Sequence, residues 1–298
     1  MINTKTAFVA IVGKPNVGKS SILNKLLGQK IAIVSDKPQT TRTRITGVLT
    51  TTDTQLVFID TPGLHKPKNT LGEKMVKAVS DGMADVDVCI FVVEPLYKKI
   101  PAADEQLIET FKKRKLNVIL AINKIDLVKD KQKMLETIAE YNNLFEFAAT
   151  VPVSAKEGTG MDTLLSEATN FMQSSPFFFD EDTLTDQPER IIAAEMIREK
   201  LLLLLEKEIP HGIAVSIESF KERSDKNIID IEAYIFTEKE SHKGIIIGKK
   251  GALLKQVGSD ARKDLEEFFE VKINLQLWVK VKEDWRNRPG LIRGFELD

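Results

Sequence analysis

The chain has 298 residues, of which 42% are hydrophobic and 29% are charged, a composition typical of soluble globular proteins. Its length predicts about two domains, and the absence of any apolar run near the roughly 18 residues needed to cross a bilayer excludes a transmembrane helix. The N-terminal segment lacks the regions of a signal peptide, and the single cysteine, Cys89, excludes a disulfide framework and a multi-cysteine metal site. We therefore expect a cytoplasmic protein in which Cys89 is a buried, inert thiol.

The net charge of −1 is unevenly distributed along the chain. Residues 1–172 contain 23 Lys and Arg against 19 Asp and Glu, whereas residues 173–298 contain 20 against 25. If the second part binds nucleic acid, it must therefore use a local basic patch and not a bulk positive charge.

The first 172 residues alternate between short β-branched runs and segments of helical periodicity. Strands are predicted at 8–12, 56–59, 88–93, 118–122 and 151–153. Helices are predicted at 20–27, 71–79, 103–113, 131–141 and 161–172. This alternation predicts an α/β domain over residues 1–172, with a mostly parallel sheet and helices on both faces.

Polar residues, prolines and an acidic cluster predict a linker at 173–189, although Phe177, Phe178 and Phe179 indicate that it packs against another segment. Beyond it, a helix is predicted at 190–207, strands at 213–219, 228–237 and 271–281, and two helices separated near Gly258. The resulting α-β-β-α-α-β order predicts a small α+β domain at 190–282, followed by a C-terminal tail at 283–298.

A phosphate-binding loop is predicted by the pattern G-x-x-x-x-G-K-S, because it lies between a predicted strand and a predicted helix. Its glycines let the backbone N–H groups point at phosphate oxygens beside the positive end of the helix. We expect Lys19 to reach the β- and γ-phosphates and the Ser20 hydroxyl to bind Mg²⁺. The predicted phosphate-binding residues are Gly13, Lys14, Pro15, Asn16, Val17, Gly18, Lys19 and Ser20.

A D-x-x-G pattern, Asp60 to Gly63, ends the predicted strand at 56–59. An acid at the carboxyl edge of a parallel strand is placed to supply a carboxylate to Mg²⁺. Gly63 is expected to bring a backbone N–H near the γ-phosphate, where the loop would sense hydrolysis.

Guanine specificity is predicted by an N-K-x-D pattern after the strand at 118–122. A carboxylate at Asp126 can accept hydrogen bonds from guanine N1–H and the 2-amino group, and adenine offers neither donor. Lys124 is expected to lie along the base and back onto the phosphate loop, Asn123 to tie neighbouring loops together, and the Ala155 N–H to reach guanine O6. The predicted base-binding residues are Asn123, Lys124, Ile125, Asp126, Ser154, Ala155 and Lys156.

The order of these motifs is that of translation-factor-related small GTPases, and residues 39–43 resemble the switch loop of the Era family. The resemblance covers nearly the whole chain. It implies a first switch at Gln39, Thr40, Thr41, Arg42 and Thr43, and a second at Asp60, Thr61, Pro62, Gly63 and Leu64. It also implies that Thr41 is the second Mg²⁺-binding hydroxyl beside Ser20 and Asp60, with Thr40 and Thr43 as alternatives to Thr41. The plain alternative for 39–43 is a threonine-rich surface turn.

Intrinsic GTP hydrolysis is expected to be slow, because Leu64 stands where Ras-like enzymes carry a glutamine that orients the attacking water. His65, Arg42 and Arg44 are weaker candidates for a catalytic role, with exposure to solvent as the alternative for each.

In related GTPases with an apolar residue after D-x-x-G, an asparagine in the phosphate loop helps to hold K⁺. Asn16 resembles it, and the alternative is that Asn16 only shapes the loop.

A G-x-x-G turn at 248–251 follows an aliphatic run, and six basic residues against one acid lie across 243–263. With the α-β-β-α-α-β order, it resembles a type II KH domain, which implies binding of single-stranded RNA over about four nucleotides. The alternative is a glycine-capped helix turn. The predicted RNA-binding residues are Lys243, Gly248, Lys249, Lys250, Gly251, Lys255 and Arg262.

Two tryptophans lie near the C-terminus. Trp285 stands among arginines, where it either stacks on RNA or belongs to a loose tail, whereas Trp278 in the predicted strand is expected in the core.

Three functions agree with these motifs to different degrees. The first is a monomeric GTP-driven switch. By resemblance to Era it binds the 3′ end of small-subunit ribosomal RNA during subunit assembly and associates loosely with the inner face of the cell membrane. The second is a tRNA-modification GTPase, although no C-terminal catalytic cysteine or folate-type domain is found. The third is a nucleic-acid-dependent motor, which the guanine motif argues against. Mg²⁺ is the expected cofactor, with K⁺ as a further candidate.

Overall fold

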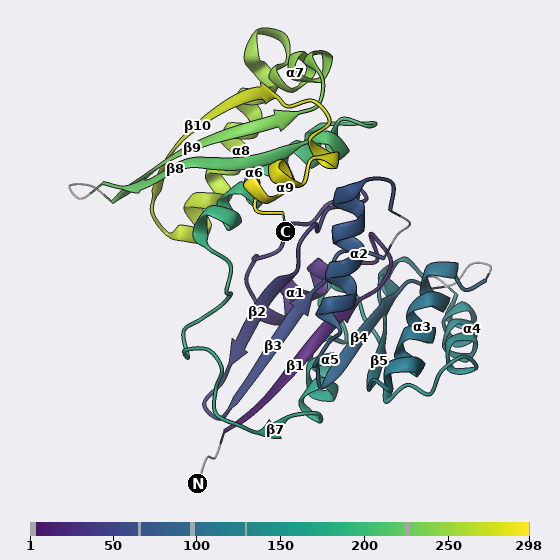
Figure 1. Cartoon of the computed structure of the whole chain (residues 1–298). Helices are drawn as coiled ribbons and strands as arrows, with labels where there is room; N and C mark the ends of the chain where they lie inside the picture. Colours follow the sequence, from purple (N-terminus) through teal and green to yellow (C-terminus); the bar gives the residue numbers. More distant parts are fainter. Residues whose placement is uncertain (1–3, 65–66, 96–98, 129, 224–226, 298) are drawn as a thin grey trace. The chain divides into compact units, whose positions relative to one another are not determined.

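The computed structural model describes residues 4–64, 67–95, 99–128, 130–223 and 227–297 (Figure 1). It divides into two compact units. The first comprises Met1–Ala32, Thr41–Lys66 and Met75–Asp186, and the second comprises Ile33–Thr40, Pro67–Lys74 and Gln187–Asp298.

The first unit is built on a mostly parallel sheet with the order β2-β3-β1-β4-β5-β6. Its strands are β1 (Lys5–Val12), β2 (Ile45–Thr50), β3 (Thr54–Asp60), β4 (Val88–Val93), β5 (Val118–Ile122) and β6 (Ala149–Pro152). β2 is antiparallel to β3 and was missed by the sequence prediction. The two-residue β7 (Gln173–Ser174) pairs antiparallel with the start of β1.

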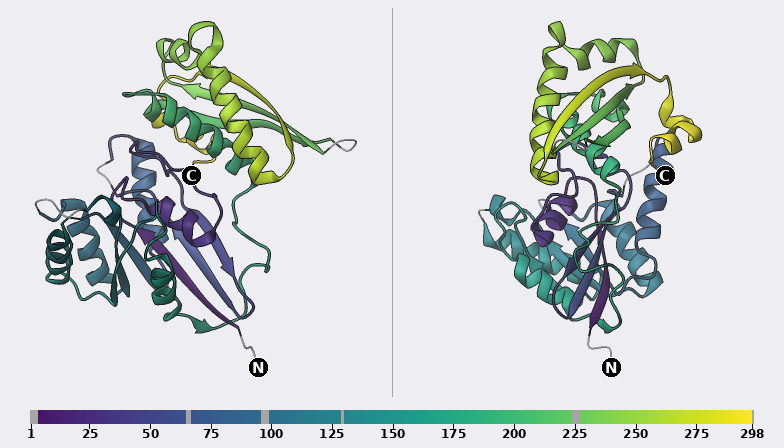
Figure 2. Two further views of the ribbon diagram at one scale, coloured as in Figure 1. Left: turned by 180° about the vertical axis from the view of Figure 1, so that it is seen from behind. Right: turned by 90° about the vertical axis from the view of Figure 1, so that its left-hand side faces the viewer.

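Helices cover both faces of this sheet, as predicted (Figures 1 and 2). They are α1 (Lys19–Leu27), α2 (Thr70–Gly82), α3 (Ala102–Arg114), α4 (Lys131–Asn142) and α5 (Met161–Thr169). Side chains from α2, α3 and α4 share one hydrophobic cluster with β1, β4 and β5, whereas α1 and α5 contact each other and strands of the same sheet. Cys89 lies in that cluster and is completely buried, as expected, and burial raises its pKa to about 12.

The chain leaving the first unit runs along its sheet. The buried Gln55 side chain accepts hydrogen bonds from the N–H groups of Phe178 and Phe179. The N–H of Val48 donates to the carbonyl of Leu184, and the ring of Phe178 lies 4.9 Å from that of Phe8. The phenylalanines of the predicted linker therefore belong to a segment that packs on the first unit.

The second unit has the predicted α-β-β-α-α-β order. Its elements are α6 (Glu189–Leu204), β8 (Ala214–Glu222), β9 (Ile228–Thr237), α7 (Glu240–Ile247), α8 (Ala252–Phe269) and β10 (Lys272–Val281). β9 is the central strand, antiparallel to β8 and parallel to β10. One hydrophobic cluster joins α6, α7 and α8 to the sheet.

The prediction of a helix break near Gly258 was wrong. Helix α8 continues through this position, and the two helices are separated at the turn 248–251. Val257, Ala261 and Leu265 are completely buried on one face of α8. Their packing outweighs the roughly 1 kcal/mol by which glycine disfavours a helix interior.

Both tryptophan predictions are corrected. Trp285 is completely buried and donates its indole N–H to the carbonyl of Gly212 at 2.9 Å, so it neither stacks on a ligand nor lies in a loose tail. Its ring packs against Phe295, beyond the short helix α9 (Pro289–Gly294). Trp278 is 40% exposed, on the face of β10 opposite its buried residues. Among the described residues, no helix has the length and apolarity that crossing a membrane requires.

Candidate functional site

The loop between β1 and α1 has the backbone shape that the phosphate motif requires. Gly13 and Gly18 have φ of 154° and 97°, and Asn16 also has a positive φ of 64°. A Cβ at Gly18 would lie 2.2 Å from the side-chain nitrogen of Asn123, and one at Gly13 would lie 2.4 Å from the carbonyl of Val92. Glycine is therefore needed at both positions for its conformation and for space.

Lys19 begins α1, and its side chain lies across the loop. Its Nζ donates to the carbonyls of Gly13 and Lys14 at 3.2 and 3.0 Å. Burial lowers the pKa of Lys19 to about 8, although the Asp60 carboxylate acts in the opposite direction. A phosphate group would supply the negative charge that favours the protonated lysine.

The three predicted magnesium ligands converge next to this loop. The Ser20 Oγ donates to Asp60 Oδ2 at 2.6 Å and lies 2.9 Å from the Thr41 Oγ1. The Thr40 hydroxyl instead donates to the carbonyl of Lys37 at 2.6 Å, so Thr41 is the threonine that the structure brings to Ser20. These residues come from α1, the segment before β2 and the end of β3.

The environment of Asp60 fits a divalent cation. Its Oδ1 is buried and has no hydrogen-bond partner within the described part of the chain. Burial raises the pKa of Asp60 to about 6, although Lys19 and the hydrogen bond from Ser20 lower it. Mg²⁺ prefers oxygen ligands and would satisfy the unpaired oxygen atom. Hydroxyl and carboxylate oxygens of Ser20, Thr41 and Asp60 are thus suited to hold it together with nucleotide phosphates.

Residues 61–64 lie against the phosphate loop. The Thr61 hydroxyl donates to the carbonyl of Ile11, and the Leu64 N–H donates to the carbonyl of Gly13. A Cβ at Gly63 would lie 2.5 Å from the backbone nitrogen of Pro15. The apolar side chain of Leu64 packs against the hydrophobic cluster of the sheet and makes no polar contact. His65 lies outside the described residues.

The first-switch residues differ in their surroundings. Gln39 has a positive φ of 63°. Arg42 is only 3% exposed, so the expectation of a solvent-facing side chain was wrong for it, whereas Arg44 is exposed.

The base motif follows β5 and is tied to the phosphate loop as predicted. The Asn123 Nδ2 donates to the carbonyl of Val17 at 2.8 Å, and Lys124 Nζ donates to the carbonyl of Asn16 at 2.7 Å. The Ser154 hydroxyl donates to Asp126 at 2.6 Å and thereby orients the carboxylate that is expected to read guanine.

The Ala155 N–H, expected to reach guanine O6, donates to Asn123 Oδ1 at 3.0 Å. To bind O6 it would have to share or exchange this hydrogen bond. Lys156 is exposed, and the Ile125 N–H donates to the carbonyl of Val153.

The sequence motifs did not include Glu94, which directly follows β4. Its carboxylate contacts Lys14 and Lys124 at 3.0 and 2.5 Å. The sequence signal that could have identified Glu94 is its position at the carboxyl end of a buried strand. The carboxyl ends of the parallel strands form the sheet edge that carries both nucleotide motifs.

In the second unit, the G-x-x-G turn separates α7 from α8. Gly248, Lys250 and Gly251 have φ of 74°, 53° and 79°. Lys249 and Lys250 are exposed on the turn, and Gly251 is the N-cap of α8. The turn therefore exposes two cationic side chains next to the positive end of an 18-residue helix.

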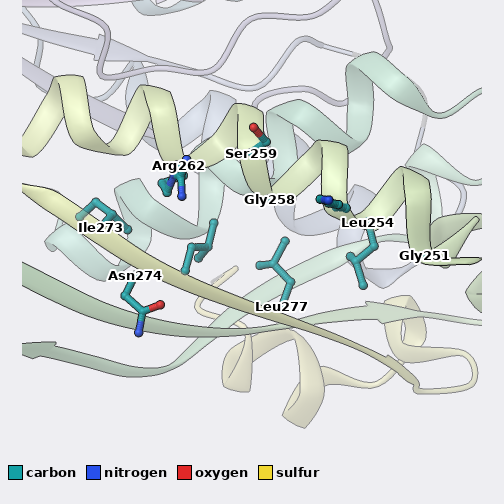
Figure 3. Close-up of a pocket in the computed structure, with 10 residues that line it drawn as sticks. Gly251, Leu254, Gly258, Ser259, Arg262, Ile273, Asn274 and Leu277 are labelled. Atoms are coloured by element: carbon teal, nitrogen blue, oxygen red, sulfur yellow. The ribbon is translucent and has the colours of Figure 1, made fainter.

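A groove of about 510 Å³ continues from this turn between α8 and β10 (Figure 3). Leu254 of α8 and Leu277 of β10 face one another across it. Lys255 and Arg262 line it, and the absence of a side chain at Gly258 keeps its middle open. Lys243 lies outside the groove lining and is 3.9 Å from Glu240. The groove residues Leu254, Ser259 and Asn274 were missed by sequence reasoning, because groove formation depends on tertiary packing.

Comparison with known proteins agrees with this two-part organisation. Residues 8–124 match the family model of the 50S ribosome-binding GTPase, and residues 208–286 match that of the KH domain. GTPase Era of Ruminiclostridium cellulolyticum is 51% identical over 289 residues, which cover 97% of this chain and 96% of the relative. GTPase Era of Clostridioides difficile is 50% identical, with 98% of each chain covered. The chain belongs to the GTPase Era family.

Solved Era-family structures have the same fold. Era in complex with MgGDPNP and nucleotides 1506–1542 of 16S ribosomal RNA is 39% identical, covers 99% of each chain and gives a TM-score of 0.94. A variant of Aquifex aeolicus Era bound to GDP and AlF4⁻ gives the same identity, coverage and TM-score. The family resemblance inferred from the motifs is confirmed, as are the P-loop GTPase fold and the KH domain. As an Era-family protein, the chain is a GTP-hydrolysing enzyme.

Proposed function

We propose that this protein is a GTP-driven molecular switch that binds single-stranded ribosomal RNA, at the 3′ end of the small-subunit RNA, during assembly of the small ribosomal subunit. The observation that carries the proposal is the presence in one chain of an assembled nucleotide site and a basic, partly apolar KH groove. The Era relative bound to a fragment of 16S RNA supports this choice of ligand.

Nucleotide binding is assigned to residues of the first unit. The phosphates would lie on the loop 13–20, with Lys19 supplying positive charge. Ser20, Thr41 and Asp60 would hold Mg²⁺, which neutralises charge that develops on the phosphates. Asp126 would accept hydrogen bonds from guanine, and Lys124 would lie along the base.

Leu64, the residue directly after D-x-x-G, is apolar and packed, so its side chain cannot orient the attacking water. We therefore propose that intrinsic hydrolysis is slow and that K⁺, held partly by Asn16, supplies positive charge near the β–γ bridge. The position of Asn16 in the phosphate loop supports the K⁺ proposal. Its backbone is left-handed, and its carbonyl accepts a hydrogen bond from Lys124. If Asn16 only shapes this loop, the rate of hydrolysis should be the same in K⁺ and in Na⁺.

RNA binding is assigned to the turn 248–251 and the adjoining groove. Lys249 and Lys250 would contact the phosphates of the strand, while Lys255 and Arg262 line the groove in which bases would lie. Leu254 and Leu277 offer apolar contacts to the base faces. A groove of this kind fits single-stranded RNA better than a duplex, because only unpaired bases can enter it.

Replacement of Lys249 and Lys250 by Asp tests this assignment. We expect the double variant to lose binding of a single-stranded RNA carrying the small-subunit 3′ sequence, and to bind GDP with wild-type affinity. The matched control changes two exposed lysines outside the groove, Lys207→Asp and Lys221→Asp, for the same change in net charge. Wild-type RNA affinity of the turn variant at moderate salt would refute the assignment.

The alternative of a tRNA-modification GTPase is not favoured, because the C-terminal part matches a KH domain model and forms its groove. A monomeric state and a loose association with the inner face of the cell membrane stay predictions.

A further inference from the structure

Glu94 lies between the two halves of the nucleotide site. It is the first residue after β4, and β4 lies between β1 and β5 in the sheet. The phosphate loop follows β1 and the base motif follows β5. The sheet order alone therefore places Glu94 at the junction between these two loops.

Its carboxylate bridges one lysine from each loop. Glu94 Oε2 lies 3.0 Å from Lys14 Nζ, and Oε1 accepts a hydrogen bond from Lys124 Nζ at 2.5 Å. Lys124 Nζ has a second acceptor, the Asn16 carbonyl, at 2.7 Å. All three side chains of the bridge are only 28–35% exposed. Burial raises the pKa of Glu94, but the hydrogen bonds and charges of the two lysines outweigh it and hold the pKa below its usual value.

Repulsion between neighbouring lysines explains why a carboxylate between them is favourable. Lys14, Lys19 and Lys124 all lie at a site that is built for a polyanion, and without an anion their charges repel one another. Lysine also loses much side-chain entropy when it is held in one geometry. A carboxylate that accepts from both Lys14 and Lys124 reduces their repulsion and fixes their positions before nucleotide arrives.

We propose that Glu94 is a positioning residue for guanine-nucleotide binding, which acts by holding Lys124 across the phosphate loop in the orientation that the base requires. The carboxylate repels phosphate, so any favourable contribution to binding must come through the lysine that it orients. The proposal rests on the guanine-nucleotide site described above. It assigns to Glu94 a role in affinity that is separate from the reading of guanine by Asp126.

The test measures the affinity and dissociation rate of a fluorescent GDP analogue with the full-length protein. Glu94→Gln has the same shape but no charge, and we expect it to raise the dissociation constant and the dissociation rate about tenfold. Glu94→Asp retains the charge and should stay within about threefold of wild type. Circular dichroism of the nucleotide-free proteins checks that each variant folds.

A double-mutant cycle with Lys124→Met separates positioning from a general structural effect. In the Lys124→Met background, Glu94→Gln should change the dissociation rate less than twofold, because the group that Glu94 holds is gone. A tenfold effect that persists there, or one that disappears only in a Lys14→Met background, would overturn the proposal. So would wild-type GDP affinity in Glu94→Gln. Failure of the wild-type protein to bind GDP would instead refute the assignment of the nucleotide site.

Discussion

The carboxylate of Asp60 is buried in the nucleotide-free protein, where its ionised form lacks the Mg²⁺ that we propose it binds. Burial raises its pKa from 3.8 to about 6. The folded, nucleotide-free protein therefore holds the Asp60 proton more tightly than the unfolded chain does. By linkage, the free energy of unfolding decreases as the pH rises from about 4 to about 6 and is then constant with respect to this group.

The magnitude follows from the pKa difference. At 1.36 kcal/mol for each pKa unit, the rise from 3.8 to about 6 corresponds to about 3 kcal/mol. Asp60→Asn removes the charge while keeping the shape, so at pH 7.5 it should stabilise the nucleotide-free protein by up to about 3 kcal/mol. The figure is an upper bound, because the substitution also removes the negative charge that favours protonated Lys19. At pH 4 the gain should nearly vanish.

The assay is calorimetric unfolding of both proteins with EDTA and without nucleotide, at pH 4 and pH 7.5. Asp53→Asn, at an exposed position between β2 and β3, is the matched control and should change neither value. Addition of Mg²⁺ and GDP should reverse the order at pH 7.5, because only the wild type retains the carboxylate ligand. An equal or lower stability of Asp60→Asn at pH 7.5 without nucleotide would refute the reasoning.

Three further predictions concern the same unit. Asp126→Asn should shift nucleotide preference from GTP toward XTP, because an amide can pair with the xanthine 2-oxo group. Competitive titration of both nucleotides measures this preference, and an unchanged GTP preference would mean that the base is read elsewhere. Gly18→Ala should destabilise the unit by roughly 2–4 kcal/mol, from a left-handed backbone and a displaced Asn123, as judged by thermal unfolding. Gly290→Ala, with no atom within 4 Å of the new Cβ, is its control and should be nearly neutral. Phosphate release should be faster in KCl than in NaCl at equal ionic strength, and Asn16→Ala should abolish the difference; equal wild-type rates in the two salts would remove K⁺ from the proposal.

The sequence determined most of the proposed nucleotide site, because local patterns specify its residues. The loop 13–20 needs glycines at two backbone positions, and its lysine and serine follow at fixed spacing. Parallel strands bring their carboxyl ends to one edge of the sheet, so motifs at those ends were expected to meet. Asn123 and Lys124 bind the carbonyls of that loop, and Thr41 reaches Ser20.

Tertiary structure decided what depends on contacts between distant segments. The interior of α8 contains Gly258, which local propensity interprets as a break, yet packing of the helix face keeps it continuous and leaves an open groove. Trp285 is flanked by charged residues in the sequence, but the Gly212 carbonyl and Phe295 bury it. Glu94 belongs to no motif, and only the neighbouring positions of β1, β4 and β5 bring it between Lys14 and Lys124. Burial and pairing across the chain are collective properties of the packed fold, whereas a glycine turn or a strand-end motif is determined by adjacent residues.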